Sequence, residues 1–177
     1  MDYDDLARRS ILGFGEMVAA LGGERAIRRP DAVGARLDGA VDNHWLDAAV
    51  VPLDAEPPAD APDLPHSLWT VAPAAPGRVE EPGIAMPCLG VALGGLDLAA
   101  DLDGARLVAP SLPVVGAVND RAYGQADQLE PLIGALDDAR IGAHGLRVDG
   151  EVACVTLTLA VGDDVRVQYV ATEQRHR

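Results

Sequence analysis

The sequence contains no lysine. All 14 of its basic residues are Arg, and 28 acidic residues outnumber them, so the formal net charge is −14 and the pI is near 4.4. A nucleic-acid-binding protein must neutralise phosphates with cations, so this balance argues against a nucleic-acid partner. The missing lysine indicates a compositional bias rather than a chemistry, and the acidic charge is read first as a solubility device.

Aromatic residues are also scarce, at 3% of the chain with a single Phe, whereas hydrophobic residues make up 49%. The core must therefore be built from Ala, Val and Leu rather than from rings, and a chain with this much apolar surface is not expected to be disordered. A length of 177 residues corresponds to one domain or two small ones.

Only two cysteines occur, Cys88 and Cys154, with neither a CxxC partner nor a nearby His. This excludes a disulfide framework or a zinc site as the basis of the fold and favours a reducing compartment. The N-terminus begins acidic, unlike a secretory signal, and no apolar run approaches the roughly 18 residues of a membrane span. We expect a cytoplasmic protein with no membrane partner.

The first half of the sequence is predicted to form one helix followed by short extended segments. Apolar residues recur at steps of three and four over residues 4–21, which predicts an amphipathic helix. Its GxG, Gly13 and Gly15, lies inside that helix and fails as a nucleotide-binding fingerprint. Extended segments are predicted at residues 26–29, 33–37, 45–53, 68–72 and 86–93, with loops at 56–65 and 73–82.

The last third of the sequence has a clearer pattern. Residues 98–113 are expected to be a linker whose acidic DLAADLDG stretch lacks the spacing of a calcium loop. Two short helices are predicted, one carrying Val114 to Ala122 and one carrying Leu129 to Leu136. Three strands follow, at residues 145–148, 151–161 and 165–172, and Asp149-Gly150 is a strong hairpin signal between the first two.

The segments VVGAVNDRAYG and LRVDGEVACVTLTLAVGDDVRVQYVATEQRHR carry a resemblance. They resemble the GNAT family of acetyl-CoA-dependent N-acetyltransferases, most closely the tandem type with a degenerate N-terminal half. The resemblance implies a mixed α/β fold with an eroded half at residues 1–98 and the front of a second GNAT domain at residues 107–177. It extends most clearly over residues 114–177 and more weakly before them.

The resemblance also implies a site at the end of the last strand. In the family, backbone groups at the position of Val170, Ala171 and Thr172 bind the pantetheine arm of acetyl-CoA. Arg177 falls at the first residue of the family's pyrophosphate-binding loop, whose glycines would follow it and do not occur in this sequence. Tyr123 and Gly124 match the loop that helps to line the acceptor site.

Several further residues have two interpretations. Tyr123 either lines the acceptor site or anchors its loop against the sheet. Glu151 is either a general base or a solvated residue beside a tight turn, and Asn119 and Asp120 are expected to cap or brace a helix end. Thr156 and Thr158 give one face of the longest strand a polarity that suits either a cleft or simple β propensity. The four histidines lack ligand spacing.

We therefore expect an acetyl-CoA-dependent N-acetyltransferase that acts on an amine of a small molecule or peptide. The pyrophosphate loop is missing, so we expect weak or no activity from these 177 residues, whether they are a fragment, an inactive product or a half completed by another chain. The alternative is a non-catalytic interaction module, in which the open edge of the last strand recruits a partner or forms a homo-oligomer. A third interpretation is an acidic domain with a coincidental meander.

Overall fold

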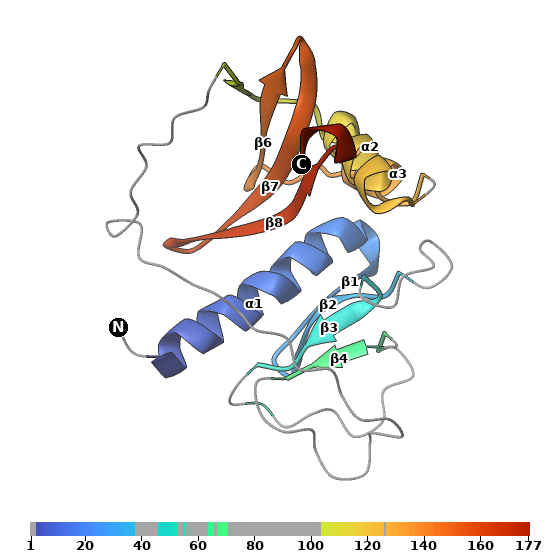
Figure 1. The fold of residues 1–177 in the computed structure, drawn as a ribbon. Helices are drawn as coiled ribbons and strands as arrows, with labels where there is room; N and C mark the ends of the chain where they lie inside the picture. Colours follow the sequence, from blue (N-terminus) through green and yellow to red (C-terminus); the bar gives the residue numbers. More distant parts are fainter. Residues whose placement is uncertain are drawn as a thin grey trace. The chain divides into compact units, whose positions relative to one another are not determined.

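The computed structural model describes residues 3–37, 46–52, 55, 64–65, 67–70, 104–125 and 127–177. The chain divides into two compact units, Met1–Gly94 and Gly95–Arg177 (Figure 1). The first unit contains a long helix and four short strands, and the second contains two helices and four strands. The described residues therefore form a mixed α/β protein, which agrees with the mixed α/β class that the resemblance implied.

The first unit begins with helix α1 (Tyr3–Gly22), which confirms the helix predicted from the apolar spacing. It packs on β1, β2 and β3 and buries Met17, Val18 and Leu21. Gly15 permits this close approach, because a Cβ at this position would lie 2.6 Å from the Val33 carbonyl oxygen. The glycine inside the helix thus has a packing role.

The strands of the first unit form a small mixed sheet in the order β1-β2-β3-β4. The first three strands are antiparallel neighbours, and β3 and β4 are parallel. Their buried positions are mostly alanine and valine, and the Phe14 and Trp69 rings lie 5.2 Å apart. The strand bounds are β1 (Ala26–Arg29), β2 (Ala32–Ala35), β3 (Ala48–Val50) and β4 (Ser67–Trp69).

Strands β2, β3 and β4 are shorter than the extended segments predicted for them, with β2 ending at Ala35 and β4 at Trp69. Among the described residues of the segment expected over 45–53, only the three of β3 form a strand, because the chain turns and bends at Leu46 and Asp47. The buried Asp47 carboxylate accepts the Leu37 backbone N–H at 2.7 Å, which stabilises this bend. The loop predicted at 73–82, most of the loop at 56–65 and the strand at 86–93 lie outside the described residues.

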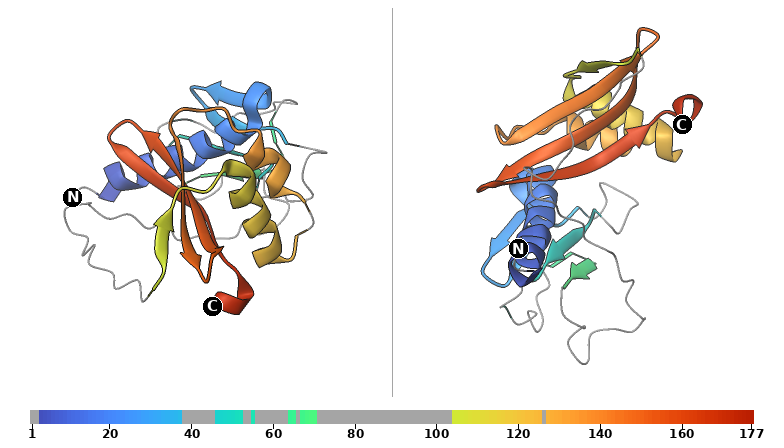
Figure 2. Two further views of the ribbon diagram at one scale, coloured as in Figure 1. Left: turned by 90° about the horizontal axis from the view of Figure 1, so that it is seen from above. Right: turned by 60° about the vertical axis from the view of Figure 1, so that its left-hand side comes forward.

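The second unit is an antiparallel sheet in the order β5-β6-β7-β8, with both helices between β5 and β6 in the chain. Helix α2 packs on β7 and β8, and α3 packs on α2 (Figure 2). This arrangement confirms the predicted succession of two helices and three strands. The elements are β5 (Arg106–Val108), α2 (Leu112–Tyr123), α3 (Leu129–Gly134), β6 (Ile141–Val148), β7 (Glu151–Val161), β8 (Asp164–Thr172) and the 3-10 turn η3 (Gln174–His176).

Two boundaries in this unit differ from prediction. The expected linker at 98–113 contains β5, which pairs with β6, and the start of α2. Strand β6 begins at Ile141 rather than at residue 145, because Ile141 to His144 pair with β7 although their small residues give no alternating signal. The predicted hairpin is confirmed: Asp149 and Gly150 have φ of 50° and 85°, as a type I′ turn requires.

The core of the second unit lies between the helices and one face of the sheet. Along β7 the odd-numbered residues Ala153 to Leu159 are buried, and the residues between them are partly exposed. Val115, Val118 and Ile133 of the helices are also buried. The predicted alternation of Thr156 and Thr158 with apolar residues is therefore confirmed, and it places the two threonines on the face away from the buried side chains.

Candidate functional site

A bulge interrupts the last strand close to the residues that the resemblance singles out. Val155 pairs with Ala171, but Leu157 pairs with Gln168, so Thr156 faces two residues of β8. One of them, Tyr169, has a φ of 54°, a left-handed conformation that costs energy for a bulky residue. The Thr156 hydroxyl donates to the Gln168 carbonyl oxygen at 3.0 Å. The bulge therefore divides β8 into two halves.

The direction of the backbone groups in the second half follows from the ladder. The Glu173 N–H donates to the Ala153 carbonyl oxygen at 2.9 Å, so the backbone of Glu173 faces β7. Alternation along an antiparallel pair then points the N–H and C=O groups of Thr172 toward the outer edge, and those of Ala171 toward β7. Strand β8 is the last in its sheet, so this edge has no strand beside it among the described residues.

Side chains from other elements reach the carbonyl oxygens of this half. The Tyr123 hydroxyl donates to the Val170 oxygen at 2.9 Å. The Arg177 Nε donates to the Thr172 oxygen at 3.0 Å. Four of the six residues predicted for the site are therefore brought together, at the end of α2 and the end of β8.

The remaining two predicted residues contribute less directly. Ala171 is buried, with its backbone in the β7–β8 ladder. Gly124 ends α2 in the left-handed conformation, with a φ of 67°, and its N–H bonds to the last carbonyls of the helix. The hydrogen bond from the neighbouring Tyr123 to Val170 shows that the tyrosine anchors the helix end to the sheet, and a role at an acceptor site stays a prediction.

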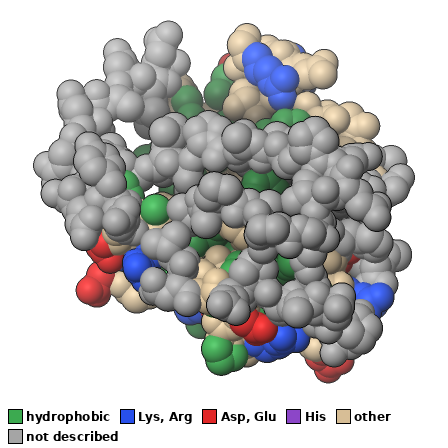
Figure 3. Space-filling model, turned by 90° about the horizontal axis from the view of Figure 1, so that it is seen from below, with side chains coloured by type: hydrophobic (Ala, Val, Ile, Leu, Met, Phe, Trp, Pro, Cys, Tyr) green, Lys and Arg blue, Asp and Glu red, His purple; other side chains and the backbone are tan. Residues whose placement is uncertain are grey.

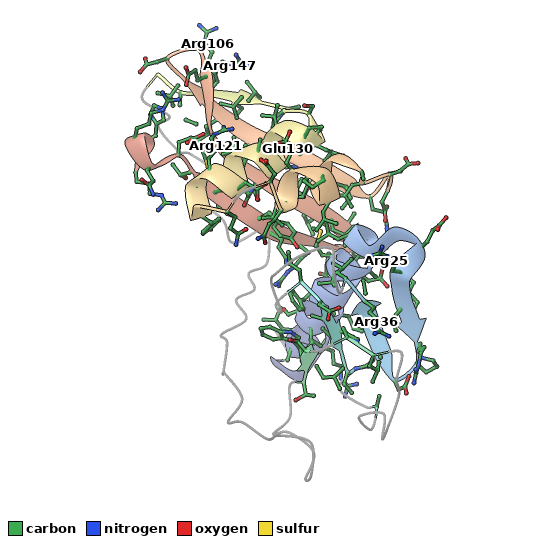
Figure 4. All side chains as sticks on the ribbon, turned by 90° about the vertical axis from the view of Figure 1, so that its right-hand side faces the viewer. Arg25, Arg36, Arg106, Arg121, Glu130 and Arg147 are labelled. Carbon is green, nitrogen blue, oxygen red and sulfur yellow. The ribbon has the colours of Figure 1, made fainter. Side chains whose placement is uncertain are left out.

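Arginine side chains surround the end of β8. Arg121, on α2, donates from Nε and Nη2 to Glu173 Oε1 at 2.9 and 2.7 Å (Figure 4 labels Arg121). Arg177 Nη2 donates to the Ala122 carbonyl oxygen at 3.0 Å. These contacts hold the last residues against α2, so three arginines, Arg121, Arg175 and Arg177, lie on or beside the end of one strand.

The bulge is braced from inside by a buried amide. Asn119, which is 1% exposed, donates from Nδ2 to the carbonyl oxygens of Val115 and Tyr169 at 3.0 and 3.1 Å. Asn119 was predicted to cap or brace a helix end; it instead lies within α2 and braces the bulged strand. The Asn119 Oδ1 and the Tyr169 hydroxyl are both buried without a hydrogen-bond partner. Burial raises the pKa of the Tyr169 phenol above its usual range, and the Gln168 side chain offsets only part of the effect.

Sequence reasoning missed Tyr169, Arg121 and Glu173. Tyr169 stands in an apolar strand as an ordinary β-forming residue, and no local pattern signals its positive φ. The ion pair of Arg121 with Glu173 joins residues 52 positions apart, which a sequence pattern does not indicate.

Other candidate residues stand elsewhere in this unit. Glu151 is exposed and forms an ion pair with Arg175, which agrees with the solvated interpretation and gives no support to a general base. The His144 Nε2 lies 2.9 Å from the Thr158 Oγ1 on the exposed face. His44, His66 and Cys88 lie outside the described residues. In the part of the chain that the structure describes, no three His, Cys, Asp or Glu side chains come together to hold a metal ion.

The charged side chains are mixed in sign. On the face shown in Figure 3, the described acidic and basic side chains lie beside one another. Arg106 and Arg147 are direct neighbours across β5 and β6, an arrangement of like charges that costs some stability (Figure 4).

No helix among the described residues is long and apolar enough to cross a membrane. Comparisons with family models, curated proteins and solved structures found no match to this chain.

Proposed function

We propose that this chain is an acetyl-CoA-dependent N-acetyltransferase of the GNAT type, with an amine of a small molecule or peptide as the acceptor. The observation that carries the proposal is the C-terminal half of β8, where outward-facing backbone groups lie beside arginine side chains. The order of elements in the second unit, two helices and then a three-stranded meander, also agrees with what the resemblance implies.

The residues at this edge fit acetyl-CoA in two respects. The Thr172 N–H points outward and can donate to a carbonyl oxygen of an extended pantetheine arm, as it would to an added strand. The carbonyl oxygens of Val170 and Thr172 each already accept one hydrogen bond, from Tyr123 or Arg177, and keep a second lone pair. Arg121 and Arg175 already pair with the carboxylates of Glu173 and Glu151, so the attraction for the negative charge of a pyrophosphate rests mainly on Arg177, which bonds to backbone carbonyl oxygens.

Acetyl-CoA would supply an activated thioester: the nitrogen of a deprotonated acceptor amine adds to its carbonyl, the C–S bond then breaks, and the proton that the nitrogen loses passes to the leaving thiolate or to solvent. The chain's part is to hold the reacting groups in line and to donate from a backbone N–H to the carbonyl that gains negative charge. Tyr123 keeps the Val170 carbonyl, and hence its peptide plane, in a fixed orientation. We assign no general base, and we expect turnover by these 177 residues to be weak or absent.

The test is a calorimetric titration of the chain with acetyl-CoA, followed by an assay of thiol release with a panel of amines. Thr172→Pro removes one outward N–H and no bond of the β7–β8 ladder, because proline is tolerated where the N–H faces outward. We expect it to weaken acetyl-CoA binding by tenfold or more, and Arg177→Ala to weaken it as well.

The matched control is Val165→Pro, which removes an outward N–H from the other half of β8 and should leave acetyl-CoA binding unchanged. Circular dichroism verifies that each variant is folded. An absence of binding at millimolar acetyl-CoA would refute the proposal. Equal weakening by both proline variants would refute the assignment of the site to residues 170–172.

A further inference from the structure

The N-terminal half of β8 presents a different kind of edge. The Ala160 N–H donates to the Arg140 carbonyl oxygen, so Ala160 faces β6, and its neighbours in β7 face β8. Alternation then points the backbone groups of Val165 and Val167 outward. No hydrogen bond from a described residue reaches them, whereas the carbonyls of Val170 and Thr172 are both occupied.

The side chains along this half favour strand addition. Val165 and Val167 are 52% and 55% exposed, and they lie on the face away from the buried residues of β7. An exposed edge of β-branched residues without proline or lysine is a template for another strand. The bulge at Tyr169 protects only the other half, because the twist and the side chains from α2 block regular pairing there.

The charges of β8 select a second copy of the same strand as the occupant. When two copies of this strand pair antiparallel, a residue whose backbone groups face the open edge must lie opposite such a residue of the other copy. Edge-facing residues alternate along the strand, so the two-fold axis that relates the copies must pass through a residue and not between two residues. An axis at Asp164 or Arg166 sets like charges against each other. An axis at Val167 places the bulged Tyr169 opposite Val165.

An axis at Val165 avoids both conflicts. It places Val165 opposite Val165 of the second copy, and it places Asp164 of each copy opposite Arg166 of the other. The interface then contains two pairs of opposite charges. We propose that two copies of this chain pair antiparallel through residues 162–168 about Val165, so that the two β7–β8 hairpins form one continuous sheet. The pairing leaves the carbonyl caps of Val170 and Thr172 in place and is independent of the acetyl-CoA proposal.

The register predicts an exchange of charges that can be tested directly. Asp164→Arg places like positive charges opposite each other in the homodimer, and Arg166→Asp places like negative charges opposite each other. For each variant alone, the dissociation constant of the dimer should rise at least tenfold, so that the variant is mainly monomeric where the unaltered chain dimerises. A mixture of the two variants should form a heterodimer, because both opposing pairs then have opposite charges. The double variant Asp164→Arg/Arg166→Asp should dimerise like the unaltered chain.

The measurement is the molar mass by light scattering over a concentration series. The mass should rise from that of one chain, 18.4 kDa, toward twice that value as the concentration increases. Micromolar to submillimolar association is expected for an interface of one strand, so the series extends to about 500 µM. Val165→Pro should abolish the dimer, and the matched Thr172→Pro should not. A monomer at every concentration would overturn the proposal, as would variants that stay monomeric when mixed or equal loss of the dimer in both proline variants.

Discussion

Asp120 is the side chain whose removal should most directly separate the two helices of the second unit. It lies on α2, is 3% exposed, and accepts hydrogen bonds from the N–H groups that begin α3. The Leu129 N–H donates to it at 2.9 Å and the Glu130 N–H donates to it at 2.9 Å. Gln128, at the N-cap position itself, makes no capping bond. One buried carboxylate thus confirms the capping role predicted for this residue.

The expected cost of Asp120→Ala follows from these two bonds. Each bond joins a backbone donor to a charged acceptor, and the substitution leaves the buried Leu129 N–H and the neighbouring Glu130 N–H without a partner. An unsatisfied buried donor costs about 1–3 kcal/mol, so the free energy of unfolding should fall by about 2–4 kcal/mol. For a unit of this size the melting temperature should fall by roughly 10–20 °C.

The assay is urea unfolding followed by circular dichroism, together with amide hydrogen exchange at Leu129 and Glu130. Both tryptophans belong to the first unit, so their fluorescence serves as a separate probe. Asp137→Ala is the control, because this exposed carboxylate lies just beyond α3 and has no described partner. A loss below about 0.5 kcal/mol for Asp120→Ala, with exchange at both amides unchanged, would refute the capping argument.

Three further predictions concern packing, burial and charge. Gly116→Ala should destabilise the protein by about 2 kcal/mol in urea unfolding, although alanine favours helices, because its Cβ would lie 2.8 Å from the Glu130 nitrogen and 2.9 Å from the Leu129 oxygen. Gly134→Ala, which would meet only the Pro113 ring at 3.3 Å, should cost much less. Tyr169→Phe should raise the free energy of unfolding by about 1 kcal/mol, because it removes a buried hydroxyl without a partner, and a loss of that size would contradict the burial. The hydrogen bond from Arg29 lowers the pKa of Asp31 below 3.8. The stabilisation of the folded state by this pair is therefore present at neutral pH and is lost as the pH falls through the lowered pKa. Arg29→Gln should return the pKa of Asp31 toward 3.8 in an NMR titration.

The sequence predicted the elements that have a strong period or a strong turn. Helix α1 and strand β7 have sustained apolar repeats, and the Asp149-Gly150 turn has a composition that few other structures accept. Strand β5 was missed because its three residues, Arg106 to Val108, form a strand only by pairing with β6. The same holds for the start of β6, where Gly142 and Ala143 have little strand propensity and the pairing with β7 decides.

The candidate site was predictable only in part, for a related reason. Tyr123, Val170, Thr172 and Arg177 were chosen by resemblance, and the bonds from Tyr123 to Val170 and from Arg177 to Ala122 depend on where α2 crosses the end of β8. Long-range contacts of this kind leave no local pattern. The bulge is a second example: it requires an αL residue, and the sequence supplies Tyr169 where glycine or asparagine would have been the signal.

The bulge gives the two halves of β8 separate chemistry. A regular strand would present one continuous edge, and any partner that paired with it would cover all of its outward groups. Here the extra residue changes the direction of the backbone at Tyr169, and Asn119 and Tyr123 of α2 donate hydrogen bonds to the carbonyl oxygens of Tyr169 and Val170. A strand added at Val165 therefore ends before it reaches Val170, and a ligand bound at Val170 does not compete with it. Regularising the strand by deletion of Tyr169 should accordingly couple the two edges, so that self-association and acetyl-CoA binding exclude each other.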